Sequence, residues 1–193
     1  NRGEVEIEPW TTFRMGKEDY FVRIDHRIEF EMGVTNSLQT AFYLNMKSTS
    51  AQADSSMQTE FEWQGISNEW KWKLRDPVAD PFGFALYFEW SASTNEAEIE
   101  AKVIADKRAG NWLFAFNAVA EPEWEFEVEQ GTDEVEAENE FNFEFDLATA
   151  YFLSPSTSLG IEVRNHNLYF PDDGGLQHSA LFAGPVVSYA AET

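Results

Sequence analysis

The chain has 193 residues, with 35 Asp and Glu against 13 Lys and Arg, and a formal net charge of −22. So acidic a surface repels phosphates and lacks the basic footprint of a nucleic-acid binder. The absence of cysteine excludes disulfides and thiolate chemistry, and an aromatic content of 16% indicates a folded chain. We expect one domain over residues 1–193, and no run approaches the roughly 18 apolar residues of a membrane helix.

Apolar and polar residues alternate with period two along almost the whole chain, which predicts β-strands. In residues 22–32, apolar side chains share one parity with His26, and charged side chains occupy the other. The parity shifts near Gly65 and Ile66, where we expect a β-bulge. The ten predicted strands are residues 4–14, 21–32, 37–46, 58–75, 83–93, 97–107, 111–128, 138–152, 157–169 and 179–190.

The predicted connections fall into two classes. Compact turns are expected at residues 33–36, 76–81, 108–110 and 154–156, and longer polar loops at 15–20, 47–57, 130–137 and 171–177, with 93–95 as a short exception. Short turns at one end, longer loops at the other and strands of about 9–11 tilted residues are typical of transmembrane barrels. The sequence therefore favours an all-β fold, an antiparallel up-and-down transmembrane β-barrel, over a soluble sandwich or a small soluble barrel.

In such a barrel the acidic parity lines a water-filled lumen, because a dry core would not tolerate so many carboxylates. The predicted lumen-facing acids are Glu29, Glu31, Glu98, Glu100, Glu121, Glu125, Glu140, Glu144, Asp146 and Glu162. The predicted lumen-facing basic and polar residues are Arg23, Arg27, Lys71, Lys73, Lys102, Arg164 and His166. The predicted membrane-facing aromatics are Phe84, Phe88, Trp90, Trp112, Phe114, Phe116, Trp124, Phe126, Phe141, Phe143 and Phe145. Tryptophans near strand ends, Trp10 and Trp63 among them, fit interface girdles.

Catalytic and metal sites are weakly indicated. Acids recur on most strands, so a glycosidase-like pair is expected by chance, and no G-x-S-x-G elbow accompanies the histidines. His178 is predicted to lie in a loop, and His166 is expected in a polar network rather than in catalysis; a lipid-modifying membrane enzyme using His166 is the minor alternative. The segment Asp172-Asp173-Gly174-Gly175 lacks the spaced calcium pattern and is read as a polar turn. We expect no cofactor and no resident metal.

Several segments, taken together, resemble a family of outer-membrane β-barrel proteins of Gram-negative bacteria. They are VEIEPWTTFRMGK, HRIEFEMGVTNSLQTAFYLN, FGFALYFEW, NWLFAFNAVAE, LSPSTSLGIEVRN and FAGPVVSY. Proteins of this kind are grouped with transporter-like barrels, including those described as phenol-degradation MetA-pathway barrels. The resemblance implies a barrel of about a dozen strands, and it supplies no catalytic residues. Because such barrels usually finish on an aromatic residue and this chain finishes at Thr193, one or two closing strands are expected beyond it.

From the resemblance and the charge pattern we predict an outer-membrane pore or transporter for small solutes, with an acidic lumen that favours cations. Its expected partners are membrane lipid, lipopolysaccharide and bridging divalent cations, and the prediction is compatible with an oligomer or a larger complex. The expected location is the outer membrane of a Gram-negative bacterium, after removal of a signal peptide. The alternative is a soluble, secreted, acidic β-sheet module that binds calcium or carbohydrate.

Overall fold

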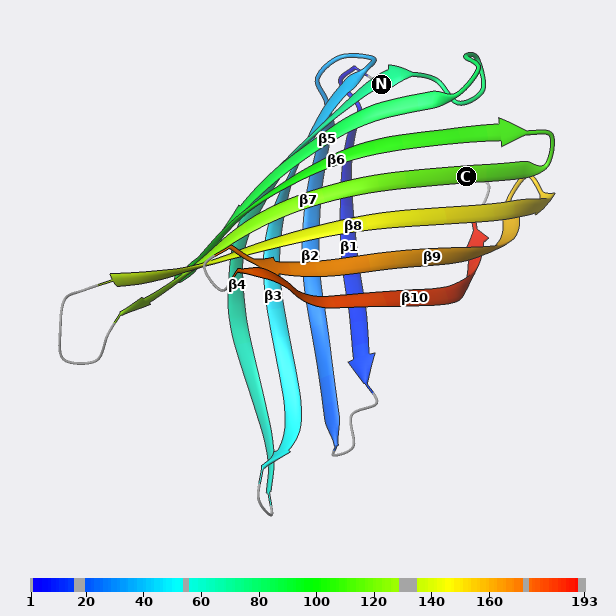
Figure 1. Cartoon of the computed structure of the whole chain (residues 1–193). Helices are drawn as coiled ribbons and strands as arrows, with labels where there is room; N and C mark the ends of the chain where they lie inside the picture. The colour runs from blue at the N-terminus through cyan, green and yellow to red at the C-terminus, as the bar shows by residue number, and fades with distance from the viewer. Residues whose placement is uncertain (1, 16–19, 54–55, 129–134, 172–173, 191–193) are drawn as a thin grey trace. The chain divides into compact units, whose positions relative to one another are not determined.

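A computed structural model describes residues 2–15, 20–53, 56–128, 135–171 and 174–190. All ten predicted strands are present (Figure 1). Their bounds are β1 Val5–Met15, β2 Phe21–Gly33, β3 Leu38–Ala53, β4 Ser56–Arg75, β5 Gly83–Ala92, β6 Glu96–Ala109, β7 Trp112–Val128, β8 Val135–Ser154, β9 Thr157–Phe170 and β10 Gly175–Tyr189. None of the described residues belongs to a helix that could cross a membrane.

The strands follow one another in chain order, each hydrogen-bonded to the next, from β1 to β10. This is an all-β, antiparallel, up-and-down arrangement, and it is consistent with a β-barrel. The predicted fold class is confirmed at that level. Two compact units make up the chain: Asn1–Trp70 with Glu89–Ala97, and Lys71–Phe88 with Glu98–Thr193. We call them the first and the second unit and describe each by itself.

The prediction of a long polar loop over residues 47–57 is wrong. β3 continues through this segment to Ala53, and β4 already begins at Ser56. The extra residues pair with the start of β2, since Asp25 lies opposite Lys47 and Phe21 opposite Ala51. A ladder is made by backbone groups, so a run of serine and threonine can extend a strand without the apolar alternation that reveals it. Two other predicted loops are shorter than expected, since β8 begins at Val135 and β10 at Gly175.

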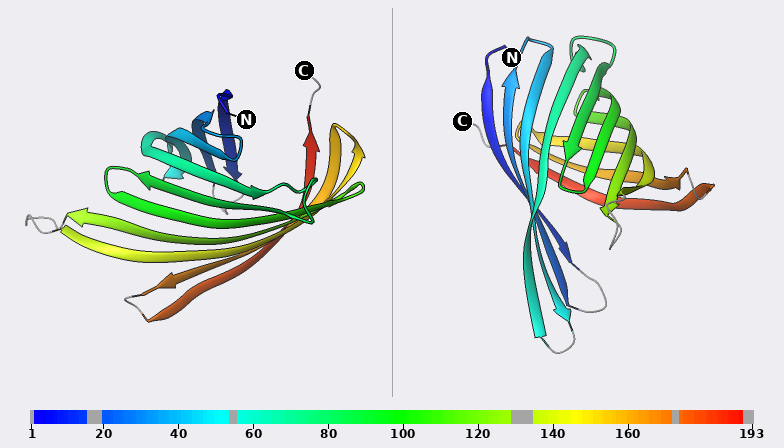
Figure 2. Two further views of the ribbon diagram at one scale, coloured as in Figure 1. Left: turned by 90° about the horizontal axis from the view of Figure 1, so that it is seen from above. Right: turned by 90° about the vertical axis from the view of Figure 1, so that its left-hand side faces the viewer.

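The two faces of the strands differ in chemistry. In the second unit, Val119 lies opposite Glu144 on one face, and on the other face Ala118 lies opposite Phe145. We call the side carrying Glu121, Glu144, Asp146 and Arg164 in the second unit, and Asp25, Arg27, Glu29 and Tyr43 in the first, the acidic face of each unit. The opposite side is the apolar face. Figure 2 shows β7, β8 and β9 running side by side, as their registers require.

Burial is inverted relative to a water-soluble domain. Among the described residues the buried hydrophobic side chains are Ala41, Tyr43 and Val119, whereas the buried polar ones are Glu29, Ser67, Asn68, Glu69, Glu89, Asn142, Ser158 and Asn167. The apolar face is left open, with Phe114 49% and Leu147 58% exposed. A protein in water normally buries its large apolar side chains, whereas this sheet leaves many of them exposed.

The predicted parity shift in β4 is confirmed and centres on Gly65. Before it, Phe61 and Trp63 are exposed; after it, Ile66 and Trp72 are exposed, so the outward parity changes from odd to even. Gly65 has a φ of +99°, a conformation that is open to glycine and strained for other residues. The glycine therefore allows the strand to change the side that each later residue faces.

The compact turn predicted at residues 76–81 is organised by Asp76. Its Oδ1 accepts hydrogen bonds from the backbone N–H groups of Val78 at 2.9 Å and Ala79 at 3.0 Å, and Lys73 lies 3.6 Å away. The Ala79 and Val78 N–H groups, followed by the charge of Lys73, lower the pKa of Asp76 below its ordinary value.

Replacing Asp76 with alanine should therefore lower the free energy of unfolding at neutral pH. A carboxyl whose pKa is depressed in the folded state stabilises that state above its unfolded pKa, and this contribution is lost as the pH falls through the folded pKa. The gap between wild type and Asp76→Ala, measured by urea unfolding, should shrink between about pH 7 and about pH 2. A gap that stayed constant over this range would show that the carboxylate charge is not what the turn uses.

Candidate functional site

Arg164 lies amid three carboxylates on the acidic face of the second unit. Its Nε is 3.4 Å from Asp146 Oδ1 and 3.6 Å from Glu144 Oε2, and its Nη2 is 3.8 Å from Glu162. The register brings them together, because Asp146 of β8 lies directly opposite Arg164 of β9. His166 joins the cluster, with Nδ1 3.3 Å from Glu144 Oε2. One arginine thus offsets three acids, so the cluster keeps an excess of negative charge.

A second group of predicted residues lies on β6, β7 and β8. Asn142 Nδ2 donates a hydrogen bond of 3.3 Å to Glu121 Oε1. Lys102 Nζ lies 2.7 Å from Glu100 and 4.5 Å from the ring centre of Tyr87. The Oε1 of Glu100 and the Oδ1 of Asp146 are buried, and each lies within ion-pair distance of a basic group, Lys102 Nζ for Glu100 and Arg164 Nε for Asp146. A buried carboxylate is tolerated when a cation lies beside it, so these two acids depend on the basic side chains next to them.

Other predicted acids face one another across the β7–β8 ladder. Glu123 lies opposite Glu140, and Glu125 lies opposite Glu138. Like charges in directly opposed positions destabilise a sheet unless water or counter-ions screen them. Glu98 lies on β6 at the same parity as Glu100. The residue pairing therefore adds to the negative charge of this face.

The basic residues predicted for β4, Lys71 and Lys73, have the parity opposite to that of the exposed Trp72 and lie near the end of the strand. Lys73 contacts the turn carboxylate of Asp76 at 3.6 Å rather than an acid of the sheet face, and Lys71 shares its strand and parity. The strand β4 ends at Arg75, so both lysines lie close to its end.

In the first unit the acidic face is tied together by Arg27 and Glu29. The Arg27 guanidinium is stacked 3.5 Å from the ring centre of Tyr43, and its Nη2 donates to Glu89 at 2.5 Å and to Ser67 at 3.2 Å. Glu29 is 8% exposed and accepts hydrogen bonds from the Tyr43 hydroxyl at 3.0 Å and from Trp10 Nε1 at 2.9 Å. Glu29 is thus buried with two hydrogen-bond donors, and the half-buried Arg27 is paired with Glu89, which offsets the cost of taking these charges out of water.

Three further contacts complete this face. The Tyr43 hydroxyl also lies within hydrogen-bond distance of Glu69, Gln39 Nε2 donates to Glu31 at 2.9 Å, and Arg23 Nε lies 2.6 Å from Asp25. The predicted residues Arg23, Arg27, Glu29 and Glu31 therefore share one surface, and sequence reasoning missed the role of Tyr43 in joining two acids.

The prediction that Trp10 belongs to an interface girdle is wrong. Its indole donates to Glu29 and lies on the acidic face. The sequence carried the signal, because Trp10 has the parity of Glu6 and Glu8 rather than that of Val5 and Ile7. The tryptophan side chain has a large apolar ring and one polar N–H group, so it can lie on either the apolar or the acidic face.

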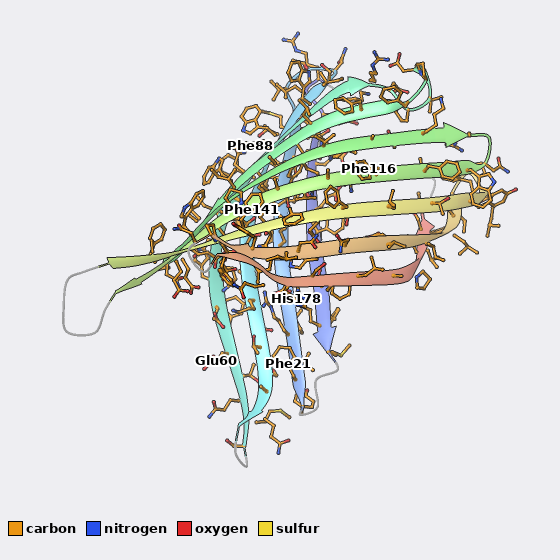
Figure 3. The ribbon with its side chains drawn as sticks, viewed as in Figure 1. Phe21, Glu60, Phe88, Phe116, Phe141 and His178 are labelled. Carbon is orange, nitrogen blue, oxygen red and sulfur yellow. The ribbon has the colours of Figure 1, made fainter. Side chains whose placement is uncertain are left out.

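The aromatic residues predicted to face lipid form a ladder on the apolar face of the second unit, where Figure 3 labels Phe88, Phe116 and Phe141. The ring centres of Trp112 and Phe114 are 6.1 Å apart, those of Phe116 and Phe145 are 6.5 Å apart, and Phe143 contacts Phe145 at 6.3 Å. Exposed members are Phe88, Trp112, Phe114, Phe116, Phe126 and Phe145; the partly exposed ones are Phe84, Trp90, Trp124, Phe141 and Phe143. Trp90 belongs to the first unit. No member of this predicted set is buried.

Two histidine predictions can be compared with the structure. His26 lies opposite Met46 and Thr11 at the parity of its apolar neighbours, as expected. His178 was expected in a loop, and this is wrong: it lies within β10 opposite Leu168, beside a register shift (Figure 3). The shift absorbs one residue, which hides the strand start from a simple period-two reading. Asp172 and Asp173 of the calcium alternative lie outside the described residues.

A polar cluster on the apolar face was not predicted. Asn167 Nδ2 donates to Asn165 Oδ1 at 2.8 Å and to the Phe143 carbonyl at 3.2 Å, and Ser179 Oγ donates to Asn167 Oδ1 at 2.7 Å. Asn165 and Asn167 continue the parity of Ile161. Asn167 is 5% exposed, so its amide is satisfied by the chain itself rather than by solvent.

Replacing Asn167 with alanine should lower the free energy of unfolding by about 1–3 kcal/mol, because Ser179 and Asn165 each lose a buried partner. Urea unfolding followed by tryptophan fluorescence measures the change. The matched control is Asn111→Ala, since Asn111 is exposed and its substitution should cost much less. Equal effects of the two substitutions would contradict a structural role for the cluster.

Comparison with known proteins adds a family but no activity. No curated protein is similar enough to the chain to count as a match. A family model described as "Family of unknown function (DUF6662)" matches residues 1–193. The match covers the strands that carry both the carboxylate clusters and the aromatic ladder, and the chain therefore belongs to the DUF6662 family.

Proposed function

We propose that this protein is an outer-membrane β-barrel that gives small solutes a path along its acidic face and favours cations over anions. The observation that carries the proposal is the inverted burial: aromatic and aliphatic side chains are open on one face, and carboxylates are held on the other. In a lipid bilayer the apolar face is satisfied by acyl chains and the acidic face by water. A hydrated path lined by carboxylates concentrates cations and repels anions.

The up-and-down strand order supports the same proposal. A membrane-spanning sheet must satisfy its backbone groups through neighbouring strands, and hairpin-connected antiparallel strands do so. The strands have 10 to 20 residues, which is enough to span a bilayer when about 9–11 tilted residues suffice. Lipid and lipopolysaccharide are the expected surroundings, and divalent cations are the expected bridges between acidic loops and lipid phosphates.

The alternative of a soluble acidic binding module accounts less well for the apolar face. A soluble monomer rarely exposes a contiguous apolar patch larger than about 600 Å², whereas the aromatic ring contacts here run along β7 and β8 on an open face. A soluble module would have to cover this face with a partner.

Conductance across a planar lipid bilayer tests the proposal. With a salt gradient across the bilayer, the folded protein should give a reversal potential on the side expected for cation preference. The preference should be larger at about 0.1 M salt than at about 1 M, where the Debye length falls from about 10 Å to about 3 Å. Anion preference, or a correctly inserted barrel that does not conduct, would overturn the proposal.

A further inference from the structure

An open pocket of about 490 Å³ lies on the acidic face of the first unit, and its chemistry differs from that of the rest of this face. Strands β1 to β4 all contribute to it, and its lining includes Trp10, Arg14, Arg23, Asp25 and Tyr43. The volume falls in the range of about 300–1,000 Å³ that is usual for small-molecule sites. In a chain with only 13 basic residues, three arginines line this one pocket.

Two of these arginines lie directly opposite each other. Arg14 of β1 and Arg23 of β2 are register partners, a placement that is unfavourable for like charges unless an anion lies between them. Asp25 supplies one such anion: its Oδ2 lies 2.8 Å from Arg14 Nε, and its Oδ1 lies 2.6 Å from Arg23 Nε. Two guanidinium groups thus share one carboxylate, which leaves one positive charge in excess among Arg14, Asp25 and Arg23.

The geometry also leaves donors for a ligand. Arg14 and Arg23 each use Nε for Asp25, so the terminal Nη groups of both side chains can donate elsewhere. Guanidinium groups match planar oxyanions such as carboxylates with two parallel hydrogen bonds. Arg27, by contrast, is held by Glu89, Ser67 and the Tyr43 ring, so it forms a fixed wall of the pocket.

The surroundings favour a singly charged ligand with an apolar body. A monoanion neutralises the one excess charge of Arg14, Asp25 and Arg23, while the carboxylate of Glu29 in the same lining and the strongly acidic chain oppose a dianion. Trp10 is 54% exposed and lines the pocket, offering an apolar surface for the rest of the ligand. The arginines share the acidic face rather than the apolar one, so the ligand arrives from water rather than from lipid.

From these contacts we infer that the pocket binds a small organic monocarboxylate, with Arg14 and Arg23 holding its carboxylate and Trp10 contacting its apolar part. This site goes beyond the cation-favouring path and does not depend on it, because binding needs no transport. The pocket would select small carboxylates from among the solutes that reach this face, because they neutralise the charge of the arginine pair.

Isothermal titration calorimetry of the folded full chain in detergent, with sodium butanoate as the probe, tests the inference. Butanoate should bind saturably, and 1-butanol and butylammonium should not, because they lack the oxyanion. Inorganic phosphate should bind more weakly than butanoate; tighter binding of phosphate would overturn the assignment to monocarboxylates, as would the absence of saturable butanoate binding.

Substitutions with opposite expected signs separate recognition from misfolding. Arg23→Gln should weaken butanoate binding about tenfold or more, since a charge-assisted hydrogen bond is lost. Asp25→Asn should strengthen it several-fold, because the competing carboxylate is neutralised. Arg75→Gln, at the end of β4 in the second unit, where the guanidinium lies over the Phe82 ring, should leave the affinity unchanged. Unchanged binding in Arg23→Gln, or weaker binding in Asp25→Asn, would contradict the inferred site, whatever the conductance of the protein.

Discussion

Replacing Gly65 with alanine is expected to destabilise the protein by about 2–6 kcal/mol, the largest stability effect that we predict for a single substitution. A Cβ at this position would lie 2.0 Å from the Ala92 carbonyl oxygen and 2.9 Å from Ser93 Cα, both of them backbone atoms that cannot swing aside. The φ of +99° adds backbone strain of about 1–3 kcal/mol for a residue with a Cβ, and the steric overlap adds about 1–3 kcal/mol.

The matched control is Gly184→Ala on β10. A Cβ at Gly184 meets nothing within 4 Å, so this substitution should change the free energy of unfolding by less than about 1 kcal/mol. Urea unfolding of both variants, with the yield of folded protein as a second readout, measures the difference. Equal stability of the two variants would show that β4 does not need the close approach between Gly65 and Ala92.

Neutralising the acidic face of the second unit should produce the largest functional change. In a variant combining Glu121→Gln, Glu144→Gln and Asp146→Asn, Arg164 loses the two nearer of the three carboxylates that now offset it. The local charge on this face would change from negative toward positive, so the cation preference in bilayers should fall several-fold at about 0.1 M salt and much less at about 1 M.

A control variant that keeps the negative charges distinguishes an effect of charge on ion preference from an effect of side-chain size. Glu121→Asp combined with Glu144→Asp retains both carboxylates while shortening the side chains, and it should keep most of the cation preference. If the neutral variant and wild type gave the same reversal potential, the acidic face would not be the surface along which ions pass.

The strands could be predicted from the sequence wherever one parity is apolar. β2 illustrates this: Ile24, Ile28 and Phe30 alternate with Arg23, Asp25 and Arg27, and the observed strand agrees with the prediction within one residue at each end. The end of β3 could not be predicted, because Ser48, Thr49 and Ser50 are polar on both sides and only the backbone ladder with β2 makes them a strand.

For the candidate site, the sequence could predict which side chains share one face of the strands but not which of them contact one another. Parity placed Glu29, Arg27 and Glu144 on one side, but their partners depend on register and on residues far away in the chain. The stacking of Arg27 on Tyr43 and its hydrogen bond to Glu89 join residues that no local pattern relates. Likewise, the opposition of Arg14 and Arg23 follows from the length of the β1–β2 connection, which sets the register of the pair.

The most direct test of the central claim, that one face of the sheet meets lipid and the other meets water, uses the absence of cysteine from the chain. Single-cysteine variants on β8 would carry a spin label at Phe145 or Leu147 on the apolar face, and at Glu144 or Ala148 on the acidic face. In lipid vesicles, labels on the apolar face should collide readily with oxygen and poorly with a water-soluble nickel complex, and labels on the acidic face should show the reverse. Apolar-face labels that are shielded from both reagents would mean that this face is packed against protein, which would contradict the membrane-barrel account.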